Sequence, residues 1–412
     1  MSLSNSGTAK GSISDRDRAR GRPAAGTGRH AAGESVASDP PPDPYAPFGP
    51  FAWADDLGPA KVVHLTERRS GLRAVLVIDN VAAGPAIGGV RVSLAADTEI
   101  CVRLARAMTL KNAMAGLRHG GAKSCIFADP GLPETDKEVL IRSFAKAIEQ
   151  LVDYVPGPDM GTDETAMAWM LDEIGRAVGL PAELGGLPLD ELGATAYGVA
   201  SATDVAAARA GLDLDGARVA IQGYGNVGRP AARFLAERGC VLVAVSDSRG
   251  GVSNQRGLDL DELEEIKRRP GSVVEYCAEP TDRDLVDVDC DIWIPAAGPD
   301  VLRGDNADRL TARVVVQGAN IAVTAEAEAR LHERGVVSVP DFVANAGGVI
   351  CGAVEYANGT RAQAFASIDD TVRANTAAVL DAADNDGLAP YEAAYAIAQE
   401  RVERAMATRR WT

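Results

Sequence analysis

Three charged residues in the first half of the chain occupy positions where a charge needs an explanation. The first is Lys111, which falls on the apolar side of a helical pattern, three residues after Met108 and seven after Leu104. Such a lysine needs an anionic partner or a shifted pKa, unless its ammonium reaches solvent along the helix surface. The pattern alone leaves both interpretations open, an anion-binding lysine and a surface lysine.

The other two, Lys123 and Asp159, lie beside small or rigid residues. Lys123 begins an expected strand directly after Gly120-Gly121-Ala122, and these small residues leave space for a ligand. Asp159 lies in a Pro/Gly loop over 154–162, just before an expected helix. An ordinary strand-edge lysine and a carboxylate that stabilises a turn are the structural alternatives.

A glycine-rich turn in the second half has the spacing of a dinucleotide-binding loop. It is a G-x-G-x-x-G pattern that follows an expected strand over 218–222 and opens an expected helix over 229–238. The glycines would allow a tight turn, the approach of the backbone to a pyrophosphate and close helix–strand packing. The helix N-terminus would donate N–H groups to the phosphates. The residues of the turn are Gly223, Tyr224, Gly225, Asn226, Val227 and Gly228.

Asp247 ends the next expected strand, 24 residues after Gly223. An acidic residue at this distance, close to the roughly 20 residues typical of the motif, is placed to accept a hydrogen bond from the ribose 2′-hydroxyl. Its charge would repel a 2′-phosphate, which favours NAD over NADP. The neighbouring Arg249 would offset part of that repulsion, so NADP stays an alternative.

The elements that must position these residues alternate between strands and helices. We expect one helix to open at Asp97-Thr98, and another to be capped by Thr162 and to run to Val178. A βαβ unit surrounds the glycine-rich turn, and such units build parallel sheets. After Asp341 the pattern is helical to the end. The short apolar runs expected to be strands are 73–79, 90–92, 123–128, 218–222, 241–246, 292–295, 314–317 and 336–340.

The chain has 412 residues, and since a single core seldom exceeds about 250–300 residues, more than one domain is expected. Residues 1–45 are rich in Ser, Gly, Arg, Ala and Pro and are expected to be a disordered tail. We expect an N-terminal α/β substrate and catalytic domain over 46–190 and a Rossmann-type, doubly wound dinucleotide-binding domain over 195–342. Helices over 343–412 would pack back toward the first domain. The predicted fold class is α/β, with an active-site cleft between the two domains.

Several segments resemble the glutamate/leucine/phenylalanine/valine dehydrogenase family and occur in the same order. The resemblance runs from about Trp53 to about Tyr356 and does not cover the tail. Residues 295–297 also match, but the next three, Gly298-Pro299-Asp300, lack the family's usual asparagine. The matching segments are 108–113, 116–117, 120–123, 129–130, 156–162, 193–199, 317–320 and 345–349.

This resemblance implies a reversible, NAD-dependent oxidative deamination of an L-amino acid to the 2-oxo acid and ammonia. By position, Lys111 would hold the substrate α-carboxylate, Lys123 would be the catalytic lysine, and Asp159 would shuttle protons to and from the amino group and the attacking water. The reaction needs such a base and positive charge near a carboxylate and a developing oxyanion. The resemblance also implies a homo-oligomer, commonly a hexamer. It places three further residues near the nicotinamide or the substrate, namely Thr195, Asn320 and Asn345.

Two positions bear on the side chain of the substrate. Glutamate dehydrogenases of the family have a lysine just before the paired glycines of G-P-x-x-G-G-x-R, where this chain has Ile87 before Gly88 and Gly89. They also have a serine four residues after the second glycine of N-A-G-G, where this chain has Gly352. Because both ligands for a side-chain carboxylate are missing, the resemblance is closer to leucine, valine and phenylalanine dehydrogenases. We therefore expect a branched-chain or aromatic L-amino acid as the substrate.

Two alternatives to this substrate prediction remain. Segment 185–190 is closer to glutamate dehydrogenases, which keeps L-glutamate as an alternative substrate. A catalytically inactive dinucleotide-binding regulator is a remote alternative, because the chain retains all three charged residues described above.

Composition and charge argue against several other classes of function. The net charge is −16, whereas binding to DNA or RNA needs a basic surface, so nucleic acid is not an expected partner. No run approaches the ~18 apolar residues of a membrane span. The six cysteines form no C-x-x-C pair and the four histidines are scattered, so no metal site is expected. Buried free thiols would fit a reducing cytosol, and we expect a cytoplasmic protein.

Overall fold

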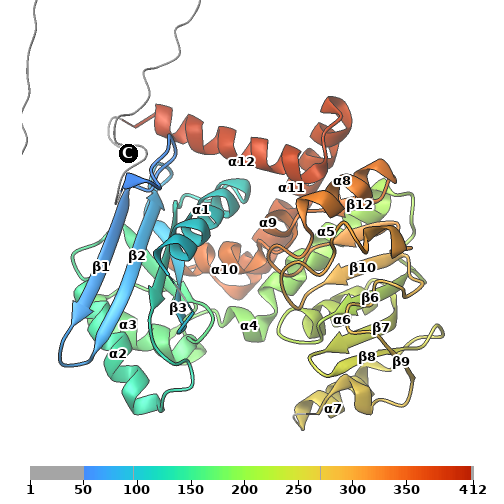
Figure 1. Ribbon diagram of the computed structural model, residues 1–412, viewed down its shortest axis with the longest axis horizontal. Coiled ribbons are helices and arrows are strands. Elements are labelled where there is room, and N and C mark those ends of the chain that lie inside the picture. Colours follow the sequence, from blue (N-terminus) through green and yellow to red (C-terminus); the bar gives the residue numbers. More distant parts are fainter. Residues whose placement is uncertain (1–50, 96, 270, 410–412) are drawn as a thin grey trace, which may run out of the picture. The chain divides into compact units, whose positions relative to one another are not determined.

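The computed structural model describes residues 51–95, 97–269 and 271–409, and the predicted tail over 1–45 lies outside them. Its first strands form a five-stranded sheet in the order β1-β2-β4-β3-β5 (Figure 1). β2 pairs antiparallel with β1 and β4, whereas β3 pairs parallel with β4 and β5. The strands are Lys61–Glu67 (β1), Leu72–Asn80 (β2), Ala86–Val92 (β3), Gly121–Ile126 (β4) and Tyr154–Pro158 (β5).

Helices cover both faces of this sheet because its central strands are apolar on both sides. On β2, Val75 and Val77 share a buried cluster with residues of α1 (Thr98–Met114). The alternate residues Leu76 and Ile78 share another cluster with residues of α2 (Glu134–Ala147) and α3 (Glu164–Ile174). Since side chains alternate between faces along a strand, α1 covers one face and α2 with α3 the other.

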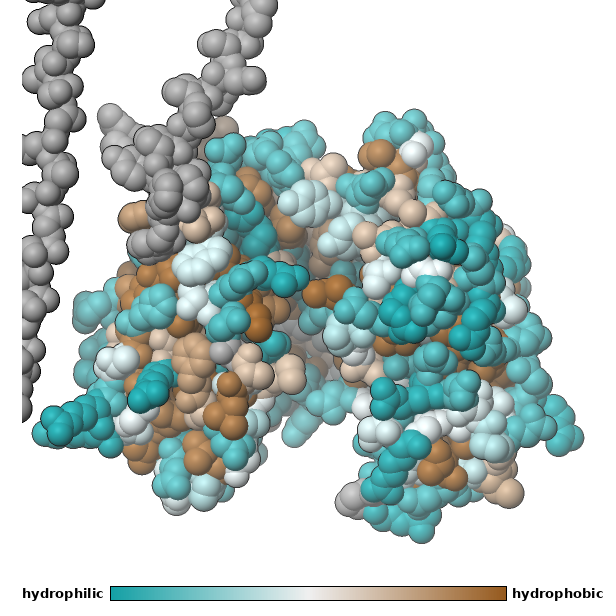
Figure 2. All heavy atoms as spheres, viewed as in Figure 1, coloured by the Kyte–Doolittle hydropathy of each residue, from teal (hydrophilic) through white to brown (hydrophobic). Residues whose placement is uncertain are grey.

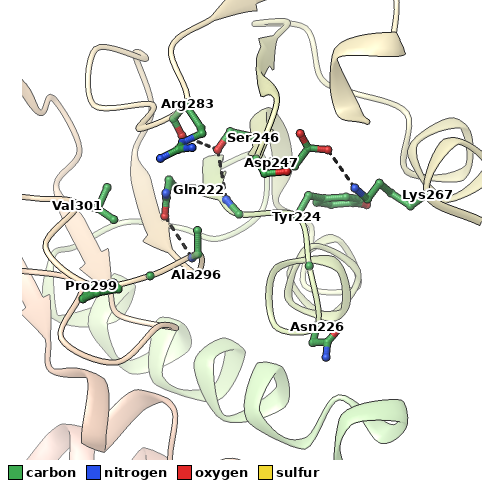
Figure 3. A pocket seen from close by; sticks show the side chains of 15 residues that line it. Gln222, Tyr224, Asn226, Ser246, Asp247, Lys267, Arg283, Ala296, Pro299 and Val301 are labelled. Atoms are coloured by element: carbon green, nitrogen blue, oxygen red, sulfur yellow. Dashed lines mark hydrogen bonds and ion pairs between the residues drawn. The ribbon is translucent and has the colours of Figure 1, made fainter. Parts of the chain in front are cut away.

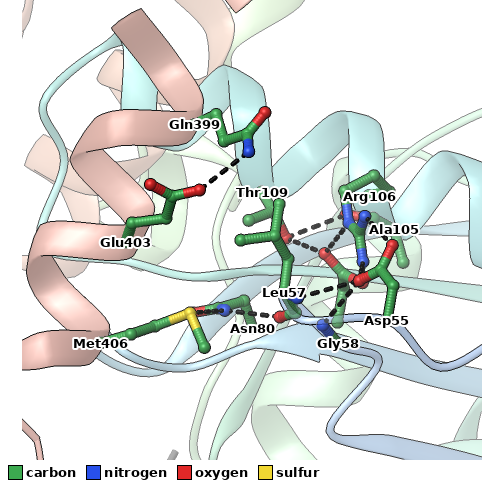
Figure 4. A network of polar contacts seen from close by, with 11 residues as sticks. Asp55, Leu57, Gly58, Asn80, Ala105, Arg106, Thr109, Gln399, Glu403 and Met406 are labelled. Carbon is green, nitrogen blue, oxygen red and sulfur yellow. Dashed lines mark hydrogen bonds and ion pairs between the residues drawn. The ribbon is translucent and has the colours of Figure 1, made fainter. Parts of the chain in front are cut away.

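A polar network fixes α1 against β2. Arg106 Nε donates to Asp79 Oδ2 over 2.9 Å, its two terminal nitrogens donate to Asp55, and Thr109 Oγ1 donates to Asp79 Oδ2 over 2.6 Å (Figure 4). Burial raises the pKa of Asp79, while Arg106 and Thr109 act in the opposite direction. The network sets the rotation of the helix and thereby the position of Lys111 in its last turn.

The edge strand β5 contradicts the expected loop over 154–162. Its residues 154–158 pair parallel with β3 over the whole of their length. The sequence did not indicate this strand because it contains Pro156 and Pro158, and proline cannot donate a hydrogen bond to a neighbouring strand. An edge strand tolerates proline, since it pairs on one side only.

Helix boundaries were predicted with mixed success. Asp97 caps α1 as expected, and its side chain accepts a hydrogen bond from the N–H of Ile100. The cap of α3 is Asp163 and not Thr162, and α3 ends before Gly175, whose φ of 69° is the left-handed conformation typical of a helix C-terminus. The predicted extension of this helix to residue 178 is therefore wrong.

The second sheet has seven strands in the order β12-β11-β10-β6-β7-β8-β9. The strands from β12 to β7 are parallel, and β8 and β9 are added antiparallel. The chain runs from β6 to β7 on one side and later returns to β10 on the other, so the strand order reverses at β6. Ligands of parallel α/β sheets bind beyond the carboxyl ends of strands at such a reversal.

The strands predicted in this half of the chain are confirmed, whereas β1, β8 and β9 were not anticipated. The strands are Arg218–Gln222 (β6), Val241–Asp247 (β7), Gly250–Ser253 (β8), Glu279–Thr281 (β9), Ile292–Pro295 (β10), Val314–Val316 (β11) and Val337–Val339 (β12). The helices between them include Gly228–Ala236 (α6), Leu260–Arg268 (α7) and Ala325–Glu333 (α8).

The last helices return to α1. Residues of α9, α10 and α12 pack against α1, and α11 packs against α5. At the end of α1, the carbonyl of Met114 accepts hydrogen bonds from Asn375 and Arg401. The predicted α/β fold class is thus confirmed, while the domain limits at 46–190, 195–342 and 343–412 stay predictions. The helices are Ala194–Arg209 (α5), Asp341–Ala344 (α9), Gly347–Tyr356 (α10), Arg361–Asp386 (α11) and Pro390–Ala407 (α12).

The surfaces over the two sheets differ in hydropathy. In the view of Figure 2, hydrophobic side chains gather where Figure 1 labels β1, β2, α2 and α3, whereas hydrophilic ones predominate around the seven-stranded sheet. Val139, Val152 and Met160 are among the exposed large hydrophobic residues on and near the five-stranded sheet and its helices. None of the helices in the described ranges combines the length and apolar character needed to cross a membrane.

Glu355 on α10 fixes the segment that leads into α5. Its buried carboxylate accepts hydrogen bonds from the N–H groups of Gly179, Leu180 and Leu187, at 2.5, 2.9 and 3.1 Å. Burial raises the pKa of Glu355, and these three donors oppose that shift. One carboxylate therefore accepts hydrogen bonds from three backbone N–H groups, and the sequence alone did not indicate this partner for them.

We expect Glu355→Ala to lower the free energy of unfolding by roughly 3 kcal/mol or more, because each buried donor left without a partner costs about 1–3 kcal/mol. Urea denaturation at fixed protein concentration measures the change. Glu400→Ala is the control, since Glu400 is exposed and pairs only with Arg404 one helical turn away. Equal midpoints for the two variants would contradict the anchoring role of Glu355.

Candidate active site

Parallel pairing in the first sheet brings Lys123 and Asp159 together. β3 lies between β4 and β5, with Val90 paired to Ser124 on one side and Pro158 on the other. Lys123 is 6% exposed, and its Nζ lies 2.8 Å from Asp159 Oδ2. The strand-edge alternative for this lysine is therefore wrong, because β4 is an interior strand.

Asp159 also binds a second cation, Arg91 at the end of β3, which sequence reasoning did not single out. Arg91 Nε lies 2.8 Å from the same Oδ2 atom. Burial would raise the pKa of Asp159, but Lys123 and Arg91 outweigh it and the pKa is lowered. The backbone is fixed too, since the N–H of Asp159 donates to Thr162 Oγ1 over 2.9 Å. Asp159 is thus held as an ionised carboxylate.

The paired glycines of β3 allow close packing at this ion pair. A Cβ atom on Gly89 would lie 2.8 Å from Asp159 Cβ and 3.1 Å from Lys123 Nζ. A Cβ atom on Gly88 would lie 1.8 Å from the carbonyl oxygen of Ala122 on β4. Gly88 therefore permits the close approach of the strands, and Gly89 permits the charged pair to pack directly against β3.

Lys111 is half-buried in the last turn of α1 and belongs to the same charged group. Burial lowers its pKa to about 8. The negative charges of Asp341 and Asp159 oppose this shift and the positive charge of Lys123 adds to it. The structure thus supports the anion-partner interpretation of this lysine over a freely solvated one.

A second group of polar residues gathers around the N-A-G-G segment at the start of α10. Asn345 Nδ2 donates to Asn320 Oδ1 over 2.9 Å, and its Oδ1 is buried without a hydrogen-bond partner among the described residues. A Cβ atom on Gly348 would lie 3.0 Å from Thr195 Oγ1. The structure therefore brings Asn320, Asn345 and Thr195 to one place, while their contacts with the nicotinamide and the substrate stay predictions.

The two positions predicted to contact the substrate side chain meet at an apolar cluster. Ile87 packs with Val155 and Val178, and a Cβ atom on Gly352 would lie 3.5 Å from Val178 Cγ2. Val155 and Val178 gave no sequence signal, because they are ordinary apolar residues outside the matching segments. The surroundings of Ile87 are thus hydrocarbon.

The glycine-rich turn borders a cavity of about 620 Å³ at the carboxyl ends of β6 and β7 (Figure 3). Gly223 has φ 97°, and a Cβ atom there would lie within 2.7 Å of Ala297. A Cβ atom on Gly228 would lie 1.9 Å from the carbonyl oxygen of Gly223, whereas one on Gly225 would meet no atom of the described residues within 4 Å. Two glycines are thus required by packing and Gly225 leaves the cavity open, which fits a pyrophosphate at the start of α6.

Asp247 lines this cavity, but donors from the protein already surround its carboxylate. Lys267 Nζ lies 3.0 Å from Oδ2 (Figure 3), and the Ser272 hydroxyl donates to Oδ1 over 2.8 Å. Burial would raise the pKa of Asp247, but the N–H groups of Arg249 and Val273, with Lys267 and Ser272, lower it to about 2. The cation that offsets Asp247 is therefore Lys267. The side chain of Arg249, which the sequence favoured, lies near Glu275 instead.

Other expectations concern cysteines and metals. Cys101, Cys125, Cys240, Cys290 and Cys351 are buried free thiols, whereas Cys277 is exposed, contrary to expectation. Across the part of the chain that the structure describes, no group of three or more His, Cys, Asp or Glu side chains is arranged to hold a metal ion.

Family models match both parts of the chain. The dimerisation domain of Glu/Leu/Phe/Val dehydrogenases matches residues 60–176, and the Glutamate/Leucine/Phenylalanine/Valine dehydrogenase model matches residues 185–410. The chain belongs to this family. It is thus an NAD(P)-dependent amino acid dehydrogenase, as the sequence predicted. The first model spans the Lys123–Asp159 pair and the second spans the glycine-rich turn.

Individual relatives agree with this assignment. Glutamate dehydrogenase from Aeropyrum pernix is 39% identical over 81% of this chain and 85% of its own length. NADP(+)-dependent glutamate dehydrogenase from Pyrobaculum calidifontis is 41% identical over 67% of this chain and 70% of its own length. NAD-specific glutamate dehydrogenase from Staphylococcus aureus is 35% identical over 81% of this chain and 85% of its own length. The hetero-hexameric glutamate dehydrogenase from Thermus thermophilus superimposes with a TM-score of 0.76 at 30% identity, over 84% of this chain and 89% of its own.

We expect Gly89→Ala to reduce kcat by about 100-fold, because displacing catalytic groups by about 1 Å is enough for such a loss. The added methyl group would push Lys123 and Asp159 apart, while affinity for NADH, measured by its fluorescence, should stay within about twofold since the cavity lies on the other sheet. Gly131→Ala, in an exposed turn, is the control. Full activity of Gly89→Ala would show that turnover does not depend on the close packing of β3 against the pair.

The surroundings of Asp247 predict which residue sets the choice of cofactor. Lys267→Met should lower kcat/KM for NADP about tenfold more than for NAD, because it removes the cation that offsets Asp247. Asp247→Ser should shift the ratio toward NADP. Initial rates with each cofactor measure both effects, with Lys137→Met on α2, a half-buried lysine beside the other sheet, as control. Unchanged ratios in both variants would contradict the assignment.

Proposed function

We propose that this dehydrogenase acts on L-glutamate, which it converts reversibly to 2-oxoglutarate and ammonia. The observation in favour is the similarity to enzymes named glutamate dehydrogenase over most of both chains. This substrate was the alternative of the sequence analysis and not its first expectation.

In the proposed reaction, Lys111 pairs with the α-carboxylate of the substrate. With a pKa of about 8 it carries its charge at neutral pH. This group contains more cations than anions, which suits an anionic ligand. The cations are Lys111, Lys123 and Arg91, and the anions are Asp159 and Asp341. We place the reacting carbon beside Lys123 Nζ and the carboxylate of Asp159.

Asp159 and Lys123 then act on the reacting carbon and its nitrogen. Asp159 accepts a proton from the substrate amino group, which leaves the nitrogen lone pair free to form the imine as hydride departs from Cα. Lys123 donates a hydrogen bond to the nitrogen or oxygen on that carbon and stabilises the charge that develops when water adds. Asp159 releases that first proton to solvent, then takes a proton from the attacking water and passes it to the nitrogen. The nitrogen leaves as ammonia, and the remaining hydroxyl gives its proton to Asp159 as the 2-oxo group forms.

The cofactor is assigned to the cavity beside the glycine-rich turn. When bound, its nicotinamide supplies the hydride acceptor. Gly225, Asn226 and Val227 would present backbone N–H groups to the pyrophosphate, and Asp247 would face the ribose. Thr195 and Asn320 would contact the nicotinamide end, with Asn345 between it and the substrate.

A branched-chain or aromatic L-amino acid is the second candidate substrate. The cluster of Ile87, Val155 and Val178 next to Gly352 favours it. A carboxylate transferred to an apolar site without a partner costs several kcal/mol, whereas a hydrocarbon side chain gains by the same transfer.

We also propose a homo-oligomer, with six subunits by analogy with its relatives. The exposed hydrophobic residues over the first sheet (Figure 2) and the dimerisation-domain model that matches this region support it. The Thermus thermophilus relative is described as hetero-hexameric. A cytoplasmic location stays a prediction.

A panel of L-amino acids with NAD and NADP tests the substrate. We expect kcat/KM for glutamate to exceed the values for leucine, valine and phenylalanine. Ile87→Lys should lower KM for glutamate at least about tenfold and depress turnover of apolar substrates, because it adds a partner for the second carboxylate. Ile87→Leu is the control and should leave the order unchanged. Higher kcat/KM for an apolar amino acid in the wild type would overturn glutamate in favour of the second candidate.

The proposed role of Lys123 predicts a loss of turnover without a loss of cofactor binding. Lys123→Ala should reduce kcat by about 1000-fold or more, since it removes the electrostatic stabilisation of the reacting carbon's substituent. NADH affinity should stay close to that of the wild type. Lys61→Ala, on β1 of the same sheet, is the matched control. Turnover near the wild-type value in Lys123→Ala would end the assignment.

A further inference from the structure

Asp341, the first residue of α9, is a buried acid that the proposed reaction does not use. Only 8% of it is exposed. Its Oδ2 accepts a hydrogen bond of 2.7 Å from the N–H of Ile321, and its Oδ1 accepts one of 2.8 Å from the N–H of Phe342. Its negative charge also acts on Lys111, and α9 packs against α1. Asp341 thus touches the loop after β11 and faces the helix that carries Lys111.

The loop that Asp341 holds is strained. Ile321 has φ 55°, in the left-handed region that β-branched residues avoid, and its side chain is 54% exposed. Such a conformation costs about 1–3 kcal/mol and persists only where the surroundings enforce it. Asn345, one helical turn after Asp341, binds Asn320 of the same loop. Two side chains of one short segment therefore fix residues 320 and 321.

We infer that Asp341 is a positioning residue that links the lysine for the substrate carboxylate to the loop for the nicotinamide. One oxygen keeps Ile321 in its strained conformation and so places Asn320, while the charge of the same carboxylate keeps Lys111 protonated. The inference rests on the proposed roles of Lys111 and Asn320. It accounts for why a buried acid lies between two sites on different sheets.

The charges around Lys111 set the sign of the expected effect. Asp341 from α9 and Asp159 from the end of β5 stabilise its ammonium, whereas Lys123 from β4 destabilises it, and burial lowers its pKa to about 8. Removing the charge of Asp341 must lower the pKa of Lys111 further. At pH 8 a smaller fraction of Lys111 is then charged, and a carboxylate ligand binds more weakly.

Two substitutions separate the two contacts. Asp341→Asn keeps an acceptor for the N–H of Ile321 but removes the charge, so NADH affinity should stay within about twofold, while 2-oxo acid affinity at pH 8 falls about tenfold. Asp341→Ala removes both, and NADH affinity should fall about tenfold as well. Asp369→Asn on α11, whose carboxylate binds Ser201 and Arg373, is the matched control.

A readout that does not depend on turnover is the pH dependence of Lys111 acylation, measured by mass spectrometry on the full chain without ligands. The midpoint should lie at about 8 in the wild type and lower in Asp341→Asn, with Asp369→Asn unchanged. Ile321→Gly should restore NADH affinity in the Asp341→Ala background, because glycine adopts the left-handed conformation without strain.

Equal Lys111 midpoints in the wild type and Asp341→Asn, or wild-type NADH affinity in Asp341→Ala, would overturn the inference. Absence of glutamate turnover in the wild type would instead overturn the proposed substrate, and the acylation midpoints would still decide the role of Asp341. If Asp341→Ala does not fold, the double variant Ile321→Gly/Asp341→Asn is used for the acylation test. A Lys111 midpoint equal to that of the wild type in this variant would also overturn the inference.

Discussion

Lys123 and Arg91 bind the same carboxylate oxygen of Asp159, and much of the first sheet is arranged to keep these three charges in contact. Removing one partner from a buried ion pair typically costs about 3–5 kcal/mol, because it leaves an uncompensated charge. The strands that carry the three residues must therefore approach closely. Gly88 meets that requirement at β4, and Gly89 meets it beside Lys123 and Asp159. The same geometry serves stability and reactivity.

Features with a local physical cause could be predicted from the sequence. The cap of α1 at Asp97 depends on one side chain and the N–H group of Ile100, so a short pattern identifies it. The turn at Gly223 needs glycines where backbone atoms crowd, and that requirement is visible in the sequence. Buried strands such as β6 and β10 appear as apolar runs because helices cover both faces of a parallel sheet.

Features that depend on contacts between distant segments could not be predicted. The edge strand β5 contains Pro156 and Pro158, which favour a loop until a neighbouring strand pairs with only one of its sides. The partner of Asp247 is Lys267 on α7, which no spacing rule connects to the end of β7. Asp341 is a further case, since its contact with Ile321 depends on a loop that only the fold places nearby.

Family membership and substrate choice rest on different residues. The family's shared chemistry acts on the α-amino and α-carboxyl groups, which every amino acid has, so membership of the family does not by itself identify the substrate side chain. The substrate side chain would touch only a few positions, and the ones we propose here include Ile87 and Gly352. A hydrocarbon pocket changes affinity by only about 1–3 kcal/mol per methylene, whereas an unpaired buried carboxylate costs several kcal/mol. If glutamate is the substrate, its second carboxylate must therefore keep water or find a cation outside the cluster of Ile87, Val155 and Val178, and that single requirement separates the two candidates.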